Sequence, residues 1–369
     1  MTDATPLDDL PLTLEGFAVR ARATLPPQIY DYFATGAADE ITLEANVAAW
    51  RNLALRQRVL IDVSAHDTST TILGRERPHP FIAAPMAWQT LAHPGGEAEH
   101  ARGIAAASGI FTLSCWSSQP VAEVAQAAPD VTRWLHLHIF TDRGLTQSLV
   151  EQAREHGFEA LVLTIDQPVT GHRYRTAGAR FTRPGSPILS GYTPALDPTV
   201  TWDDVAALAA SAGLPLIVKG LLDAADVPLA IDSGVAGIVV SNHGARQLDT
   251  VLPTAVALPA VVDAVAGAVD VLVDGGIRRG TDAVKALALG ASGVLVGRQL
   301  LWSLASGGAP AVQSGLELLV TEFRTALAVI GIPHARDLDR HTLLPAPWAN
   351  WPASHDPGHQ PDERKPHEQ

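Results

Sequence analysis

Eight short apolar runs alternate with alanine-rich segments of helical periodicity through most of this chain of 369 residues. Runs of this kind, rich in β-branched residues and bounded by glycine or polar residues, predict strands that are buried on both faces. The segments between them predict covering helices. A regular alternation of strand and helix is typical of a parallel sheet. The predicted strands cover residues 81–84, 109–113, 134–139, 160–164, 216–218, 237–240, 271–274 and 293–296.

The number of units favours a closed (β/α)8 barrel, the TIM barrel, within the α/β class. An open doubly wound sheet would give the same alternation, but the glycine fingerprint of dinucleotide-binding sheets is missing after the first strand. We expect three helices before the barrel, so the fold class is a barrel with an N-terminal helical extension. The predicted helices cover residues 14–23, 27–34, 40–50, 95–107, 145–155, 201–212, 224–232, 253–265 and 281–289.

Domain organisation and location follow from length and composition. We expect residues 1–345 to form one domain, with the helical extension in about residues 1–75, and the charged, Pro- and His-rich residues 346–369 to be disordered. A net charge of −13 without a basic stretch argues against a nucleic-acid partner. A single cysteine, no signal-peptide pattern and no apolar run of about 18 residues predict a cytoplasmic protein without a membrane partner.

The most informative motif is Ser241-Asn242-His243-Gly244-Ala245-Arg246-Gln247, directly after the predicted strand 237–240. Barrel enzymes carry their catalytic residues at this end of the strands. His243 titrates near neutrality and can act as a base, and Arg246 can bind a carboxylate through two parallel hydrogen bonds. A histidine near an arginine is more often a surface pair. Together, however, a base and an anion-binding group suit the oxidation of a 2-hydroxy acid.

Two further strand ends carry glycines and arginines. Asp274-Gly275-Gly276-Ile277-Arg278 and Gly297-Arg298 follow the seventh and eighth strands, the usual phosphate site of such barrels. Lys219 ends the fifth strand, where a buried lysine requires an anion. Taken alone, the first string could be a tight turn and Lys219 could extend to solvent at the barrel rim.

These motifs resemble the active-site signature of the FMN-dependent 2-hydroxy-acid oxidases and dehydrogenases, the family of glycolate oxidase and lactate oxidase. The resemblance runs from about residue 10 to about residue 345. It implies bound FMN, a 2-hydroxy acid substrate, a 2-oxo acid product, O2 or another electron acceptor, and a homo-oligomer, which is a tetramer in the family. Ala87 matches the small residue of oxygen-using relatives, which favours an oxidase that produces hydrogen peroxide.

The resemblance also implies roles for single residues. His243 is expected to be the base, Asp166 to orient it, and Lys219 to stabilise negative charge on the reduced flavin. The expected substrate-binding residues are Arg246, Arg173, Tyr32 and His138, with Trp116 lining the pocket. The expected FMN contacts are Pro85, Met86, Ala87, Ser114, His136, Thr164, Lys219, Ser241, Asp274, Gly275, Gly276, Arg278, Gly297 and Arg298.

The third strand departs from the family pattern, because His136 and His138 stand where relatives usually have glutamine and tyrosine. Alternation along a strand points both rings into the barrel mouth. An imidazole can replace the hydrogen bonds of either residue, although we expect His138 to become cationic below neutral pH. The change is either a neutral replacement or a sign of a different substrate, such as a larger, carrier-attached or amine compound. A paired-histidine metal site is disfavoured, and we assign no metal.

The segment between Thr164 and Lys219 is shorter than in typical relatives, where it covers the substrate. Its prolines and glycines in residues 175–195 predict a short irregular lid. A shorter lid either admits a larger substrate or has no consequence. Two other functions stay open: a flavin-binding protein without catalysis, and a flavin barrel that acts as an amine or isomerising enzyme.

Overall fold

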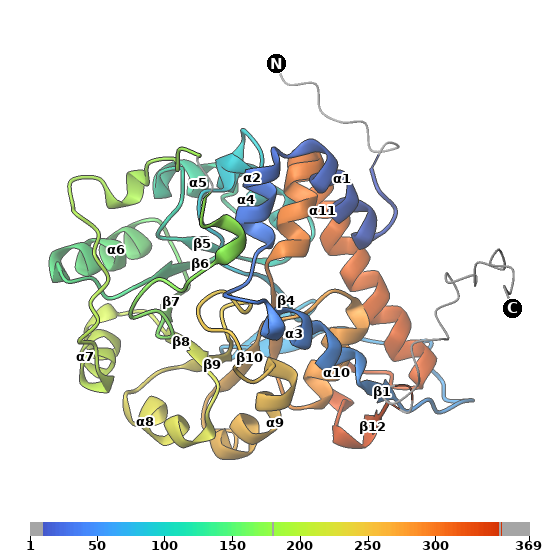
Figure 1. Ribbon diagram of the computed structural model, residues 1–369. Helices are drawn as coiled ribbons and strands as arrows, with labels where there is room; N and C mark the ends of the chain where they lie inside the picture. Colours follow the sequence, from blue (N-terminus) through green and yellow to red (C-terminus); the bar gives the residue numbers. More distant parts are fainter. Residues whose placement is uncertain (1–9, 179–180, 347, 349–369) are drawn as a thin grey trace, which may run out of the picture.

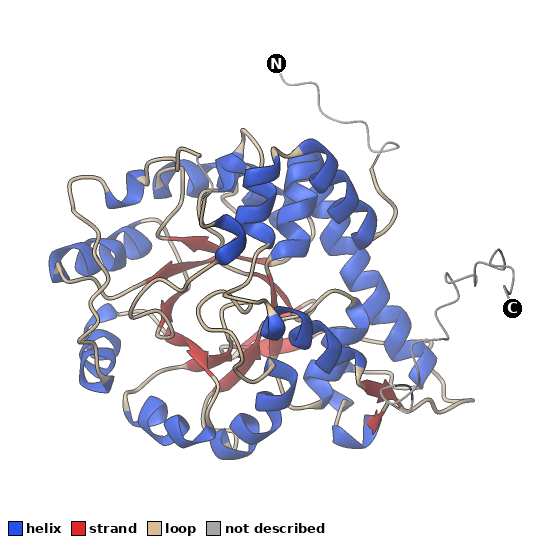
Figure 2. Ribbon diagram, in the orientation of Figure 1, coloured by secondary structure: helices blue, strands red, loops and turns tan. Residues whose placement is uncertain are grey.

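Eight parallel strands close into a barrel in the order β4-β5-β6-β7-β8-β9-β10-β11, which confirms the predicted (β/α)8 fold. The computed structural model describes residues 10–178, 181–346 and 348. Figure 2 shows the strands at the centre with helices around them. The strands are β4 (Phe81–Ala83), β5 (Ile110–Ser114), β6 (Thr132–Leu137), β7 (Ala160–Thr164), β8 (Leu216–Leu221), β9 (Gly237–Val240), β10 (Asp270–Val273) and β11 (Gly293–Val296).

Strand β8 is longer than predicted because it continues past a bulge. Its register against β9 shifts between Lys219 and Leu221. Gly220, between them, has φ +118°, a conformation that favours glycine. A Cβ atom on Gly220 would lie 2.5 Å from the Cβ of Asp166. The bulge therefore leaves room for Asp166 beside Lys219.

A hairpin that was not predicted closes the N-terminal end of the barrel. Strands β2 (Thr70–Ile72) and β3 (Arg75–Arg77) pair antiparallel. Ile72 is fully buried and belongs to the apolar cluster of the barrel interior, together with Trp134 and Leu272. The Oγ1 of Thr70 donates to the carbonyl of Ser292, 2.9 Å away, just before β11. The Ile72 side chain of the hairpin thus fills the N-terminal end of the barrel.

Helices surround the barrel, as Figure 1 shows. Those within the βα units are α4 (Gly96–Ala106), α5 (Val121–Ala127), α6 (Arg143–Glu155), α7 (Trp202–Ala212), α8 (Val227–Asp232), α9 (Thr254–Val265), α10 (Gly280–Ala288) and α11 (Arg298–Ile330). The prediction of a helix over 224–232 was too long, because Ala224–Asp226 form a 3-10 turn capped by the Asp223 side chain. The predicted helices did not include α5 or α11. Helix α11 bends where Gly307 and Gly308 leave helical geometry.

The three predicted N-terminal helices are present as α1 (Leu14–Thr24), α2 (Pro27–Ala34) and α3 (Ile41–Arg51). Helix α1 packs on α11, and α3 packs on α9. Strand β1 (Leu53–Leu55) pairs antiparallel with β12 (Leu343–Pro345), so the end of the barrel domain returns to the N-terminal extension. The predicted disordered tail, residues 346–369, lies outside the described residues except for Ala346 and Trp348.

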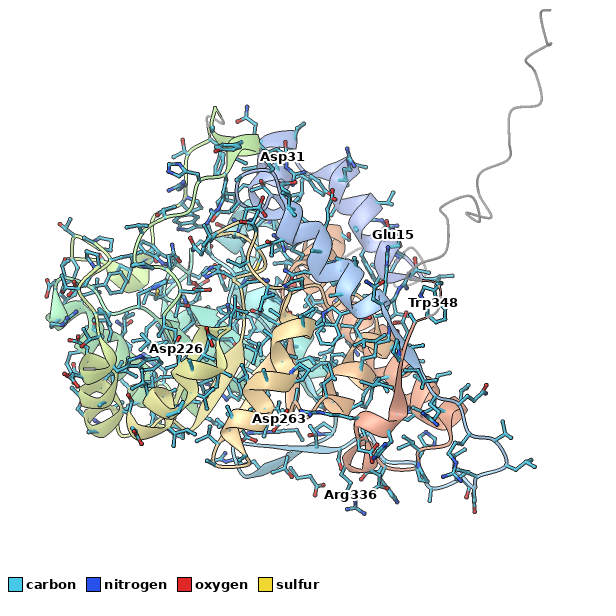
Figure 3. The ribbon with its side chains drawn as sticks, turned by 60° about the horizontal axis from the view of Figure 1, so that its bottom comes forward. Glu15, Asp31, Asp226, Asp263, Arg336 and Trp348 are labelled. Carbon is cyan, nitrogen blue, oxygen red and sulfur yellow. The ribbon has the colours of Figure 1, made fainter. Side chains whose placement is uncertain are left out.

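Charge is distributed unevenly between the outer surface and the barrel mouth. The chain carries a net charge of −13, and acidic side chains such as Asp226 and Asp263 lie exposed near α8 and on α9, as labelled in Figure 3. The mouth instead gathers arginines. A low-dielectric cavity with one sign of charge concentrates ligands of the opposite sign. Among the described residues, no helix has the length and apolar character needed to cross a bilayer.

Candidate active site

A cavity of about 580 Å³ opens at the C-terminal ends of the barrel strands. Nineteen of the residues that the sequence analysis assigned to the site line this cavity. They come from the ends of all eight strands and from α2. They are Tyr32, Pro85, Met86, Ala87, Ser114, Trp116, His136, His138, Thr164, Arg173, Lys219, His243, Arg246, Asp274, Gly275, Gly276, Arg278, Gly297 and Arg298. The two others, Asp166 and Ser241, lie behind this lining and contact it.

His243 and Asp166 form a hydrogen-bonded pair. The Nδ1–H of His243 donates to Oδ1 of Asp166 over 2.9 Å, which leaves Nε2 of His243 as the unprotonated nitrogen. Burial lowers the pKa of His243, and the charge of Asp166 only partly offsets this effect. Burial raises the pKa of Asp166, but the charge and hydrogen bond of His243 outweigh it and hold that pKa below its usual range. The pair therefore presents a neutral imidazole near neutral pH.

The backbone around His243 is held in an unusual conformation. His243, Gly244 and Ala245 have φ values of +57°, +61° and +62°. Such a run is costly for residues with a Cβ and requires support from neighbouring groups. Asn242 supplies that support: its Oδ1 accepts from the Ala245 amide at 3.1 Å, and its side-chain amide exchanges hydrogen bonds of 2.8 and 2.9 Å with Asn46 of α3. Helix α3 thus fixes the loop that carries the base.

Lys219 and Asp274 form a buried ion pair of 3.1 Å between β8 and the end of β10. The Nζ of Lys219 also donates to Oγ of Ser241 at 3.0 Å, and the same Oγ accepts from the His243 amide at 3.0 Å. The Oδ1 atom of Asp274 is buried without a partner in the described chain. Ser241 thus connects the lysine to the histidine loop, and Asp274 retains an acceptor for a donor of a bound molecule.

Two arginines and a tyrosine, which the sequence analysis assigned to substrate binding, line the cavity together. The guanidinium carbon of Arg246 lies 5.5 Å from the centre of the Tyr32 ring, and Nη1 donates to the carbonyl of Thr35 at 2.8 Å. Arg173 donates from Nε to the carbonyl of Arg246 at 3.2 Å. Burial and the nearby charge of Arg173 lower the pKa of Arg246 to about 10, so it remains a cation near neutral pH. Burial also raises the pKa of Tyr32, which keeps its phenol protonated.

The predicted phosphate-binding residues line the same cavity, and Arg298 lies beside Arg246, since both donate to the carbonyls of Phe33 and Thr35. Gly276 has φ +81°, and a Cβ there would lie 2.3 Å from the carbonyl oxygen of Asn46. Gly297 precedes α11, whose first turn has no side-chain cap. The guanidinium of Arg298 donates to the carbonyls of Phe33, Thr35 and Gly244 at 3.0 to 3.1 Å, so it also joins α2 to the histidine loop, a role that the sequence did not predict.

His136 and His138 point into the cavity from β6 and its C-terminal end, as predicted. The ring nitrogens of His136 lie 2.8 Å from Thr164 Oγ1 and 3.3 Å from Ser114 Oγ. His138 is buried, with 3% of its surface exposed, and its burial and the charge of nearby His243 lower its pKa to about 3. The expectation that His138 becomes cationic just below neutral pH is therefore wrong: an imidazole enclosed by aromatic rings loses the hydration that a cation needs.

A third possible metal ligand accompanies these two histidines. Cys115, His136 and His138 place their ligand atoms within 4.8 Å of one another in the described chain. The sequence analysis counted only the histidines. Both ring nitrogens of His136 already face hydroxyl groups, and burial raises the pKa of the Cys115 thiol. A metal ion would have to displace these hydrogen bonds and a proton held by a buried sulfur.

Sequence reasoning missed two neighbouring members of the site. Trp88 lies in the first strand's loop with φ +53°, and the guanidinium carbon of Arg183 stands 5.1 Å from the centre of its ring. Both residues line the cavity. Trp88 follows directly after Pro85-Met86-Ala87, the predicted flavin contacts, so its position in the sequence could have predicted that it lines the cavity. Arg183 belongs to the irregular lid, where no periodicity indicates the direction of a side chain.

The geometry places a hydrogen-bonded His–Asp pair, several arginines and a set of glycines around one cavity at the C-terminal end of a (β/α)8 barrel. A family model described as FMN-dependent dehydrogenase matches residues 21–193 and 186–345. The chain is 42% identical to glycolate oxidase 3 of Arabidopsis thaliana, over 89% of this chain and 94% of that protein. It is 41% identical to an L-lactate oxidase of a Nostoc strain, over 90% and 98%. The chain belongs to the FMN-dependent dehydrogenase family.

A solved structure agrees with this assignment. Mandelate oxidase with (S)-2-phenylpropionate superposes with a TM-score of 0.84 at 38% identity, over 90% of this chain and 98% of that one.

The residues present fit FMN. Gly275 and Gly276, with φ of +83° and +81°, line the cavity beside the uncapped start of α11, and both segments can offer backbone amides to a phosphate. The free Oδ1 of Asp274 can accept from a ribityl hydroxyl. Lys219 would lie at the negative end of the ring system, and Ser114, His136 and Thr164 offer donors and acceptors to its polar edge. FMN supplies the acceptor for two electrons.

Proposed function

We propose that this protein oxidises an L-2-hydroxy acid to a 2-oxo acid with FMN, and passes the electrons to O2 to give hydrogen peroxide. The observation that carries the proposal is the 2.9 Å pair of His243 and Asp166 in the cavity that Arg246 and Arg173 also line. A base beside a carboxylate-binding pair is what proton removal from a 2-hydroxy acid requires. Relatives named glycolate oxidase and L-lactate oxidase support the same reaction.

Each residue contributes one function to this reaction. Arg246 and Arg173 bind the substrate carboxylate, and the Tyr32 hydroxyl donates to it. Nε2 of His243 accepts the proton that the substrate loses, and Asp166 stabilises the resulting imidazolium. Lys219 stabilises negative charge that develops beside it.

The neutral state of His138 supports an ordinary hydroxy-acid site. At a pKa of about 3 its imidazole replaces a phenol as an uncharged hydrogen-bonding group beside the substrate oxygen. A charged group there would instead have favoured a substrate of different charge. We therefore propose that His138 is a neutral replacement, and not the mark of an amine oxidation.

The deciding experiment is anaerobic addition of L-2-hydroxy acids to the purified yellow protein. Loss of the oxidised flavin absorbance, followed by its recovery and hydrogen peroxide formation on admission of air, is the expected result. Bleaching by amino compounds alone, or by none of the compounds, would overturn the proposal. Mass analysis of the released cofactor should identify FMN.

We also propose a homo-oligomer in the cytoplasm. Three exposed apolar side chains, Leu248 and Leu252 after the histidine loop and Val256 in the first turn of α9, support a contact between copies. A chain with one cysteine has no internal disulfide to lose in a reducing compartment. Light scattering after size exclusion measures the mass in solution, and a monomer at micromolar concentration would contradict the oligomer.

A further inference from the structure

Arg183, in the lid between β7 and α7, has no assigned role in the reaction proposed above. It lines the same cavity, is exposed at its mouth, and forms no ion pair with any residue that the structure describes. Its neighbour in the lid, Arg175, differs in this respect. Arg175 is paired with Glu40 at 2.7 Å and lies near Asp31 of α2, which Figure 3 labels. Arg183 therefore offers an uncompensated cation to a ligand.

Two contacts hold Arg183 toward the cavity. Its guanidinium carbon stacks 5.1 Å above the Trp88 ring, a cation–π geometry that restricts the side chain. Three residues later the lid is attached to the barrel, because the Oγ of Ser186 lies 2.9 Å from the carbonyls of both Cys115 and Ser117. The following residues Ile188 and Leu189 are buried. The cation is thus positioned before any ligand arrives.

A row of two aromatic rings runs from the guanidinium of Arg246 to that of Arg183. Tyr32 and Trp88 have ring centres 5.8 Å apart. Arg246 lies over the first ring of this row and Arg183 over the second. A molecule that reaches from one guanidinium to the other would lie along the two rings. Such a molecule needs anionic groups at both ends and an apolar middle.

We propose that the preferred substrate is a 2-hydroxy acid with a second anionic group at its far end, which Arg183 binds. This inference rests on the proposed function for the position of the first carboxylate. Arg246 and Arg173 hold the carboxylate next to the reacting carbon, the aromatic row contacts the chain between, and Arg183 binds the distal carboxylate. The guanidinium fork matches a carboxylate in two hydrogen bonds, and stacking on Trp88 keeps its plane oriented.

The test compares an unreactive dianion with a neutral-ended analogue of the same backbone length. Binding of 2-oxoadipate and of 2-oxohexanoate to the holoenzyme is measured from the change in flavin absorbance. Because Arg183 is partly exposed, we expect the dianion to bind about five- to tenfold more tightly at low salt. The preference should shrink as ionic strength rises. Equal binding of the two acids would overturn the inference.

Substitutions assign the preference to one residue. Arg183→Gln should remove the preference for the dianion, with a change of less than about twofold for 2-oxohexanoate, and Arg183→Lys should restore part of it. Arg175→Gln removes the same charge from the same lid, away from the cavity, and should retain the preference. A uniform loss of affinity for both acids in Arg183→Gln would contradict the inference.

The proposed function and this inference can fail separately. Flavin reduction by 2-hydroxyadipate and by 2-hydroxyhexanoate tests the reaction, and the binding measurement tests the role of Arg183 without turnover. Reduction by both acids at equal kcat/KM, together with equal binding, leaves the oxidase intact and rejects the distal site. A binding preference for the dianion without any flavin reduction keeps the distal site and rejects the reaction.

Discussion

His243 and Asp166 come from loops 77 residues apart, and a hydrogen bond of 2.9 Å joins them at the barrel mouth. Asp166 follows β7 and His243 follows β9, so the barrel brings the two strand ends together across the intervening end of β8. The bond decides which nitrogen of the imidazole can accept a proton. The catalytic proposal depends on this pair more than on any other contact, and the first two predictions test it.

Replacing His243 with Gln should reduce the rate of flavin reduction by about 100- to 10,000-fold, because the general base is lost. FMN should remain bound, since the glycine turn at Gly276 and the start of α11 are unchanged. Anaerobic stopped-flow measures the first quantity, and the flavin-to-protein absorbance ratio measures the second. A variant that keeps more than about a tenth of the rate would show that His243 is not the base.

Gly220→Ala should displace Asp166, because the new Cβ would lie 2.5 Å from the Cβ of Asp166. We expect flavin reduction to slow by about 100-fold, the usual cost of a misplacement of about 1 Å. The apparent pKa of His243 should fall further, since Asp166 is the neighbour that raises it.

Gly234→Ala is the matched control. Gly234 also has a positive φ, +75°, but a Cβ added there would have no atom within 4 Å. It should lose stability without a change in the pH profile of flavin reduction. Equal pH profiles for Gly220→Ala and the wild type would contradict the positioning role of the bulge.

Much of the site could be predicted because the ends of parallel strands meet at one end of a barrel. Ser114, Thr164, Lys219 and Asp274 each occur at such an end, so their position in the sequence determined their place in the cavity. The titration of His138 could not be predicted, because it depends on how completely other parts of the chain bury the ring.

Parts of the fold also could not be predicted from the sequence. The strands and most helices have a periodic pattern, whereas the β2–β3 hairpin is too short to have one. The direction of Arg183 depends on packing between distant segments, because its guanidinium stacks on Trp88 of the loop after β4. The kink has a local signal in Gly307, Gly308 and Pro310 of α11, whereas local sequence does not encode the direction of Arg183.

The rate of flavin reduction should show no more than one ionisation between about pH 5 and 8. The neutral form of His243 is required, so the rate should rise with pH through the pKa of His243, which burial holds below 6.5. His138, with a pKa of about 3, should add no second ionisation in this range. His138→Tyr should therefore leave the number of ionisations unchanged. A second ionisation that this substitution removes would show that His138 titrates near neutrality.

Arg246→Lys should weaken substrate binding by about tenfold, because an ammonium group cannot form the paired hydrogen bonds of a guanidinium. The loss should appear mainly in KM for the hydroxy acid. Lys is also too short to keep the bond from Arg246 Nη1 to the Thr35 carbonyl. Substrate titrations of the reduction rate separate the two parameters. A loss confined to the limiting rate would place Arg246 in the chemical step instead.

Folding stability should decrease as pH falls below about 6.5. His100 is fully buried, and burial lowers its pKa to about 3. Between pH 6.5 and 3 the unfolded chain binds a proton that the folded chain does not, so protonation favours unfolding. The Tm of the wild type should fall more steeply than that of His100→Asn between about pH 6.5 and 5.

The control for this measurement is His341→Asn, because His341 is exposed in the folded chain. It should show the wild-type dependence of Tm on pH. An unchanged slope in His100→Asn would mean that the buried ring at this position is not what limits acid stability.

The hairpin side chain Ile72 gives the barrel a closed floor, and this affects the order of events in a catalytic cycle. The cavity opens at the other end of the barrel, where Tyr32 of α2 and Arg183 of the lid line it, so we expect the hydroxy acid, its product and O2 to enter and leave there. A 2-oxo acid that has not departed stands in the path of the oxidant. We therefore expect product release and reoxidation to compete for one entrance, so that the residence time of the product limits how soon the next electron transfer begins.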